Sequence, residues 1–155
     1  MYSHEIARSL KAAATSDPMA SALSAAGFTG GLHYGTRASL KADVLRPYAT
    51  YSVSEIERES NSSGVALVTY EVELSVVVDQ KGSVAGRILN VFQRYWSRLG
   101  NLTALDPDLA RLVLVHPGAS EIGEADERDH GEDVILGNTS LTIRISEHQP
   151  EIEEV

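Results

Sequence analysis

The sequence contains no cysteine, and that absence removes several kinds of function at once. Disulfide bonds, thiolate zinc sites and cysteine nucleophiles are excluded, because each of them needs the thiol group. The longest apolar run is about five residues, far short of the roughly 20 that a membrane helix needs. The N-terminal residues MYSHEIARSL also lack the basic and apolar regions of an export signal. We therefore expect a soluble, unexported protein with no membrane partner.

Basic residues are scarce as well. Lysine and arginine together number 13 against 22 acidic residues, which gives a formal net charge of −9. A DNA-binding surface gains its free energy by releasing counterions at Lys and Arg contacts, so this balance disfavours DNA as a ligand. An acidic wall can still border a passage for DNA, because it repels the phosphates and prevents sticking.

The residues that are present have the balance of a folded domain. Hydrophobic residues make up 43% of the 155 positions and charged residues 23%, which argues against wholesale disorder. A chain of this length buries roughly two-thirds of its unfolded surface around one core. We expect one domain over residues 1–147, followed by an acidic, flexible tail over residues 148–155.

Two helices are predicted at the N-terminus. Residues 4–14 are rich in alanine and carry apolar residues at helical spacing. The next helix is bracketed by Asp17 as N-cap, Pro18 at the first helical position and Gly27 as a C-terminal stop. Residues 32–34 favour a short strand within the loop that follows.

The middle and end of the chain favour strands and one further helix. The alternation of apolar and polar residues over 65–78 predicts a long, half-buried strand. Residues 47–59 favour a partly exposed edge strand, and residues 112–115 and 141–146 favour two more. Residues 84–99 change to the helical period. The expected fold is an α+β domain with a mainly antiparallel sheet of four to five strands, packed against a long amphipathic helix, with N-terminal helices.

The helix predicted over 84–99 has two faces of different character. Arg87, Arg94 and Arg98 follow one another at i, i+7 and i+11 and form a basic face. Trp96 lies beside the apolar stripe, which makes it a candidate rim or interface residue. In an acidic protein, such a basic face can meet an acidic face of a neighbouring copy. The predicted apolar stripe is Val84, Ile88, Val91, Phe92, Tyr95 and Leu99.

Residues 121–133, EIGEADERDHGED, hold seven carboxylates and one histidine. Counted as a calcium loop from Asp126, the stretch does place a glycine at the required sixth position. The third, fifth and twelfth positions, however, are Arg128, His130 and Gly137, which do not supply the oxygen ligands of that loop. The stretch is better interpreted as a connecting loop whose like charges stay in water or contact another subunit.

A metal site in this stretch would require further ligands that folding brings close from elsewhere in the chain. His130 has no second histidine within ten residues on either side, so a zinc site would require His116 to be brought beside it. A metal-dependent enzyme that uses His116, His130 and nearby carboxylates therefore stays as an alternative. The candidate interface or channel-lining acids of the stretch are Glu124, Asp126, Glu127, Asp129, Glu132 and Asp133.

The order of elements resembles a known family. The segments are DPMASALSAAG, RPYATYSVSE, LVTYEVELSVVV and VAGRILNVFQRYWSRL, followed by a polar, acid-rich stretch and a final SLTIRIS. This layout, over about residues 5–147, is similar to that of the tail-terminator, or tail-completion, proteins of long-tailed bacteriophages and phage-like particles. The linker at 100–111 and the segment VILGN depart from the usual pattern.

The resemblance implies a structural role. It implies a subunit of a ring, typically a hexamer, that caps the tail tube and contacts the head or neck connector in the virion. DNA would pass through the ring without specific binding. The resemblance implies neither enzymatic activity nor a cofactor. The alternative within the same class is another neck or tail component, such as a head-closure or tube-like protein.

Overall fold

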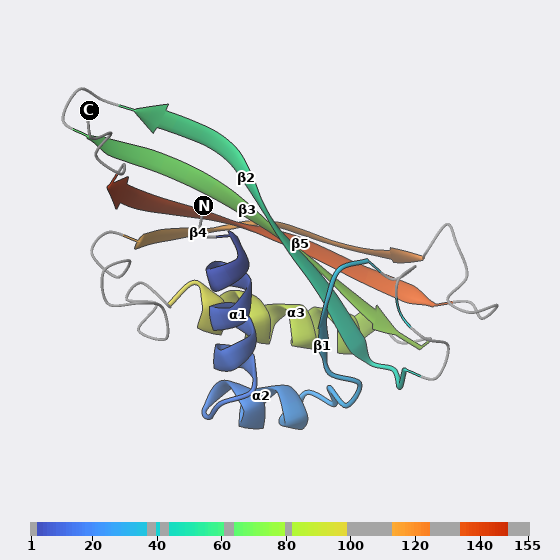
Figure 1. The fold of residues 1–155 in the computed structure, drawn as a ribbon. Coiled ribbons are helices and arrows are strands. Elements are labelled where there is room, and N and C mark those ends of the chain that lie inside the picture. Colours follow the sequence, from blue (N-terminus) through green and yellow to red (C-terminus); the bar gives the residue numbers. More distant parts are fainter. Residues whose placement is uncertain are drawn as a thin grey trace.

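The computed structural model describes residues 3–36, 40, 44–60, 64–79, 82–98, 113–124 and 134–148. Within these ranges the chain forms three helices and one five-stranded sheet, so the predicted α+β class is confirmed (Figure 1). The elements are α1 Ser3–Ala14, α2 Met19–Ala25, β1 Leu32–Tyr34, β2 Tyr48–Ser60, β3 Val65–Val78, α3 Gly82–Trp96, β4 Val113–Glu124 and β5 Ile135–His148.

The sheet has the strand order β1-β2-β3-β5-β4. The four long strands pair antiparallel, as expected, but β1 runs parallel to β2, which makes the sheet mixed. Among the residues that the structure describes, β1 pairs only with residues 49–51, so β2 is an inner strand there and an edge strand over the remainder of its length. The three helices lie on one side of the sheet (Figure 1).

The central strand β3 confirms the predicted alternation. Its apolar side faces the helices, and its residues on that side are all buried, because a strand directs successive side chains to opposite faces. On the other side, Glu73 is exposed and Leu67 keeps 41% of its surface in solvent. The buried set is Ala66, Val68, Tyr70, Val72, Leu74, Val76 and Val78.

The buried stripe of α3 differs from the predicted one. Of the predicted stripe, Val84, Val91 and Tyr95 are only partly buried, because the helix is turned so that neighbouring positions face the sheet. Leu99 lies outside the described residues. The residues of α3 that are fully buried are Ala85, Ile88, Leu89, Phe92 and Trp96.

The predicted interface role of Trp96 is wrong. Its side chain is 0% exposed, and its indole Nε1 donates a hydrogen bond to the carbonyl oxygen of Leu10 in α1 at 3.2 Å. Its ring centre lies 4.8 Å from that of Phe92 and 6.0 Å from that of Tyr51. Trp96 is therefore a core residue, because α1 packs against the side of α3 on which Trp96 lies, a contact that the sequence pattern did not predict.

A glycine sets how closely α3 approaches the sheet. Gly137 of β5 lies under the helix, and a Cβ atom at this position would be 2.7 Å from Cδ1 of Leu89. Such a distance is too short for carbon atoms in van der Waals contact. The absence of a side chain at Gly137 therefore lets α3 pack directly against β5.

Several ends of helices and strands differ from the predicted ones. α2 begins at Met19 with Pro18 as its N-cap residue, so Asp17 is not the N-cap; its carboxylate oxygen instead accepts a hydrogen bond from Oγ of Ser21 at 2.5 Å. Gly27 has a φ of 89°, as the predicted helix stop requires. The short strand predicted at 32–34 is confirmed as β1.

The last two strands are longer than predicted. β4 continues to Glu124 instead of ending at Val115, so its end includes the first four residues of the acidic stretch. β5 runs from Ile135 to His148, and the pairing of His148 with Val65 places this histidine in the sheet and not in the tail. The remaining tail, residues 149–155, lies outside the described residues.

Candidate functional site

The face of the sheet opposite the helices carries polar side chains at its centre. On β3 these are Glu71, Glu73 and Ser75, the residues that point away from the buried side. The register places Ser75 opposite Asn138 of β5, and Asn138 opposite Glu121 of β4. Residues far apart in the sequence thus meet on one surface because three strands pair side by side.

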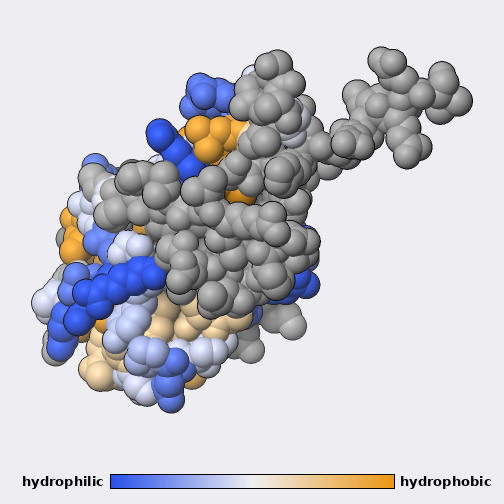
Figure 2. Space-filling model, turned by 90° about the vertical axis from the view of Figure 1, so that its left-hand side faces the viewer, coloured by the Kyte–Doolittle hydropathy of each residue, from blue (hydrophilic) through white to orange (hydrophobic). Residues whose placement is uncertain are grey.

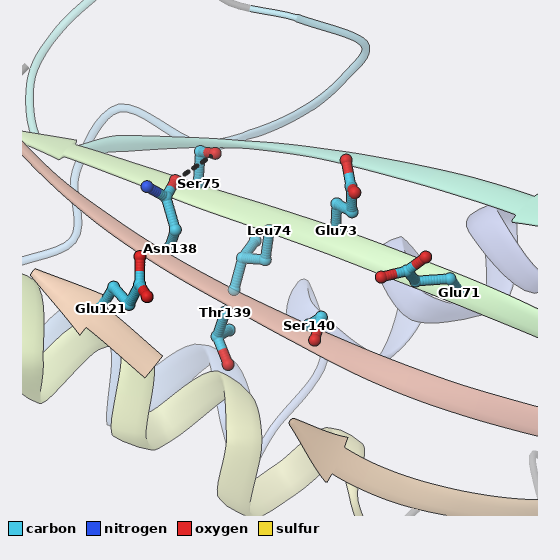
Figure 3. A pocket seen from close by; sticks show the side chains of 8 residues that line it. All are labelled: Glu71, Glu73, Leu74, Ser75, Glu121, Asn138, Thr139 and Ser140. Atoms are coloured by element: carbon cyan, nitrogen blue, oxygen red, sulfur yellow. Dashed lines mark hydrogen bonds between the residues drawn. The ribbon is translucent and has the colours of Figure 1, made fainter. Parts of the chain in front are cut away.

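These residues surround a shallow hollow of about 380 Å³ (Figure 3). Glu73 and Glu121 are exposed and Glu71 is partly exposed. None of the three carboxylates has an ion-pair partner in the part of the chain that the structure describes. The hollow is therefore an acidic, concave surface open to solvent. Its lining residues are Glu71, Glu73, Leu74, Ser75, Glu121, Asn138, Thr139 and Ser140.

Two side chains in the hollow hold each other in place. Oγ of Ser75 donates a hydrogen bond to Oδ1 of Asn138 at 2.7 Å, and Figure 3 shows the pair between β3 and β5. The bond leaves the amide nitrogen of Asn138 free to donate elsewhere. The centre of the hollow is thus fixed by the sheet, while the carboxylates at its border stay available to a partner.

The outer side of α3 has the opposite charge. Its exposed residues follow one another at intervals of three or four, which places them on one stripe of the helix. Arg98 continues the stripe in the turn after the helix, where its backbone N–H bonds the carbonyl of Tyr95 at 3.2 Å. The stripe carries three arginines and no acid. Its residues are Ser83, Arg87, Asn90, Arg94 and Arg98.

The arginine stripe and the acidic hollow lie on opposite sides of the fold. The buried side of α3 packs on the sheet, so its exposed side points away from the sheet. The hollow opens on the sheet face that the helices do not cover. One side of the molecule is therefore basic along a helix, and the other is acidic at the centre of a sheet.

A polar contact fixes α3 relative to the strands beneath it. The side-chain amide nitrogen of Gln93 lies 2.7 Å from Oγ1 of Thr139, 2.8 Å from Oγ of Ser120 and 3.2 Å from the carbonyl oxygen of Gly118. These acceptors belong to β5 and to the irregular part of β4 near Pro117. The contact spans one helix and two strands, and it holds the arginine stripe in a constant position.

Within the described part of the sheet, the edge that β2 exposes beyond β1 is poorly suited to pairing with another chain. All residues from Ser54 to Ser60 are exposed, and the register shifts between Glu55 and Glu57. An ion pair of 2.6 Å joins Arg58 to Glu55 on this segment. A bulge and closely spaced charges are common protections of an edge strand against added strands.

The large apolar side chains that are exposed in the described residues lie on several different elements. In the coloured part of Figure 2, hydrophobic areas lie beside hydrophilic groups. Two of the exposed apolar side chains are Ile56 in β2 and Leu67 in β3. Scattered apolar residues of this kind are ordinary on a protein surface. Charge is thus the clearer signal for a contact surface.

The predicted site residues have different outcomes. Arg87, Arg94 and Arg98 lie together on the exposed side of α3. Glu124 is the last residue of β4, paired with Ile135, and not part of a loop. The other predicted acids lie outside the described residues; they are Asp126, Glu127, Asp129, Glu132 and Asp133.

The metal-dependent alternative relies on two histidines, His116 and His130. His116 lies in β4 opposite Thr142, and His130 lies outside the described residues. No group of three or more His, Cys, Asp or Glu side chains that could hold a metal ion occurs in the described ranges.

Sequence reasoning missed the acidic hollow. Its signal was present in part, since Glu71 and Glu73 occupy the polar positions of the alternating strand. The contribution of Glu121 could not be predicted, because it depends on which strand pairs with β5.

The described helices include none that is long and apolar enough to span a membrane. No known family model and no curated protein matches the chain.

Proposed function

We propose that this protein is a structural subunit of a ring that closes the tail tube of a phage-like particle and joins it to the head or neck connector. The observation that supports the proposal is the opposite charge of the two sides of the fold. Copies that present different surfaces on opposite sides can associate head to tail. Such heterologous contacts form a closed ring when the rotation between neighbours permits it.

The order of elements supports the same proposal, because it resembles that of the tail-terminator proteins. The net charge of −9 also suits the role. A ring of six such subunits would border a channel with an acidic wall, which DNA would cross without binding. The tail tube protein and the connector would be the partners on the two sides of the ring.

The test is the shape and mass of the purified protein. We expect native mass spectrometry to give a hexamer and negative-stain electron microscopy to show rings with a central hole. Isolated tail tubes without a terminator would take up the protein at one end. A protein that stays monomeric in solution and never adds to the end of a tube would contradict the proposal.

A further inference from the structure

We propose that the arginine stripe of α3, Arg87, Arg94 and Arg98, docks into the acidic hollow on the sheet face of a second copy of this chain. The inference names the contact between neighbouring subunits, and it rests on the proposed function for the closure of that contact into a ring. The occupant of the hollow is thus another molecule of the same protein, bound head to tail.

Charge complementarity is the first support for this contact. Two molecules with a net charge of −9 repel each other, so they associate only where local charges are arranged to attract. The stripe offers three exposed guanidinium groups, and the hollow offers the carboxylates of Glu71, Glu73 and Glu121. Arginine pairs with a carboxylate through two parallel hydrogen bonds, which gives the contact a defined geometry.

The two charged surfaces also match in length. Each helical residue rises 1.5 Å, so Arg87 and Arg98 are about 16 Å apart along the stripe. Glu121 is level with Ser75 and two strands away from it. Four residues along β3 and two spacings between strands therefore separate Glu71 from Glu121, which is about 16 Å across the sheet.

Shape and rigidity favour the same arrangement. The stripe is the convex side of a helix, and the acidic surface is a hollow of about 380 Å³ (Figure 3). The helix is held by the contacts of Gln93 with β4 and β5, and the carboxylates stand on paired strands. The backbones that carry the two surfaces are therefore already ordered, so association orders only side chains, which lowers its entropic cost.

The test exchanges the charges of the two surfaces. One variant carries Arg87→Glu, Arg94→Glu and Arg98→Glu, and the other carries Glu71→Lys, Glu73→Lys and Glu121→Lys. Each variant alone places like charges in contact, so we expect its self-association to weaken by at least about tenfold in sedimentation velocity. In a 1:1 mixture each altered surface meets the opposite charge, and we expect the assembly to return.

Matched controls use exposed charges elsewhere in the fold. Arg8→Glu with Lys11→Glu changes basic residues of α1, and Asp17→Lys changes an exposed acidic residue in the turn before α2. Both controls should assemble as the wild type does. Circular dichroism of every variant checks that it is folded. The return of assembly in the mixture would show that both charge-reversed chains can still associate.

The outcomes separate the inference from the proposed function. Rings that persist in both reversed variants would overturn the charge contact and leave the ring intact as a proposal. Charge-dependent chains or dimers without closure would support the contact and count against the ring. Failure of the mixture to associate even at low salt would overturn the contact. Arginine-dependent binding of a DNA duplex by the monomer would assign the stripe to nucleic acid and overturn it as well.

Discussion

The two faces of strand β3 differ in what they contribute to the protein. On the helix side, every residue from Ala66 to Val78 at alternate positions is buried, and the side chains pack with α1 and α3. On the opposite side, Glu71 and Glu73 stand at the border of a hollow with no ion-pair partner in the described ranges. The main core thus lies on the helix side. The opposite side buries a smaller cluster of Tyr48, Val77 and Val134, while its carboxylates are available for contact with another molecule.

Replacement of Trp96 by alanine should have the largest effect on the buried side. It removes a fully buried indole and leaves the carbonyl of Leu10 without its hydrogen bond. We expect the free energy of unfolding to fall by about 3–5 kcal/mol, measured by urea denaturation. Trp96→Phe should cost less, because most of the packing is kept. If Trp96→Ala had normal stability but impaired self-association, Trp96 would be an interface residue and not a core residue.

A substitution at Gly137 tests how closely α3 must pack against the sheet. In Gly137→Ala the new methyl group meets Cδ1 of Leu89 at 2.7 Å and has Cβ of Ala85 at 3.4 Å. We expect a loss of about 1–3 kcal/mol in thermal or urea unfolding, because the core is already filled. Gly123→Ala is the matched control in β4, since no atom lies within 4 Å of the added Cβ. Equal stability of the two variants would show that α3 can move away without cost.

The contribution of Tyr51 to the stability of the buried side depends on pH. Its hydroxyl donates a hydrogen bond of 2.7 Å to the carbonyl oxygen of Ala7. Burial, together with the neighbouring Tyr34, raises the pKa of Tyr51 from 10.0 to about 12. The unfolded chain therefore loses this proton first, and the stabilising contribution of Tyr51, complete below pH 10, decreases between pH 10 and about pH 12.

The corresponding variant is Tyr51→Phe. At neutral pH it should lower the free energy of unfolding by about 1–2 kcal/mol, because a buried carbonyl loses its partner. Between about pH 9 and about pH 11 the wild type should lose about 1 kcal/mol of this advantage over the variant. Urea denaturation at about pH 9 and about pH 11 measures the difference. A constant difference across the two pH values would contradict the raised pKa.

Glu73→Gln should have the smallest effect on folding. Glu73 is exposed and has no ion-pair partner within the described residues, so we expect a change in unfolding free energy within about 0.5 kcal/mol. The same substitution should weaken self-association measurably in sedimentation experiments at low salt. Asp17→Asn, in the turn before α2, is the control that should change neither quantity, because its Oδ1 can still accept the hydrogen bond from Ser21. A loss of stability in Glu73→Gln would show that the two faces of β3 are not separable.

Local patterns in the sequence predicted much of the fold. The alternation over 65–78 located β3 and its buried side, because the side-chain period of a strand is two. Gly27 marked the end of α2, since only glycine adopts a φ of 89° without strain. The α+β class followed from one helical period among several strand-like segments. These features depend on residues that are close in the sequence.

The acidic stretch was harder to interpret for a physical reason. Its first four residues, 121–124, contain a single isoleucine, and nothing in their own pattern favours a strand. They belong to β4 because β5 pairs with them over Glu121 to Glu124. Backbone hydrogen bonds to a distant segment can impose a strand on residues of low β propensity.

The sequence by itself determined the class of the fold, the two-sided character of β3 and the single row of arginines on one helix. These follow from the fixed periods of strands and helices. The tertiary structure alone decided that α1 would bury Trp96 and that Glu121 would join Glu71 and Glu73. Both outcomes depend on contacts between residues that are far apart in the chain, and such contacts are set by strand register and helix packing, which no local pattern encodes.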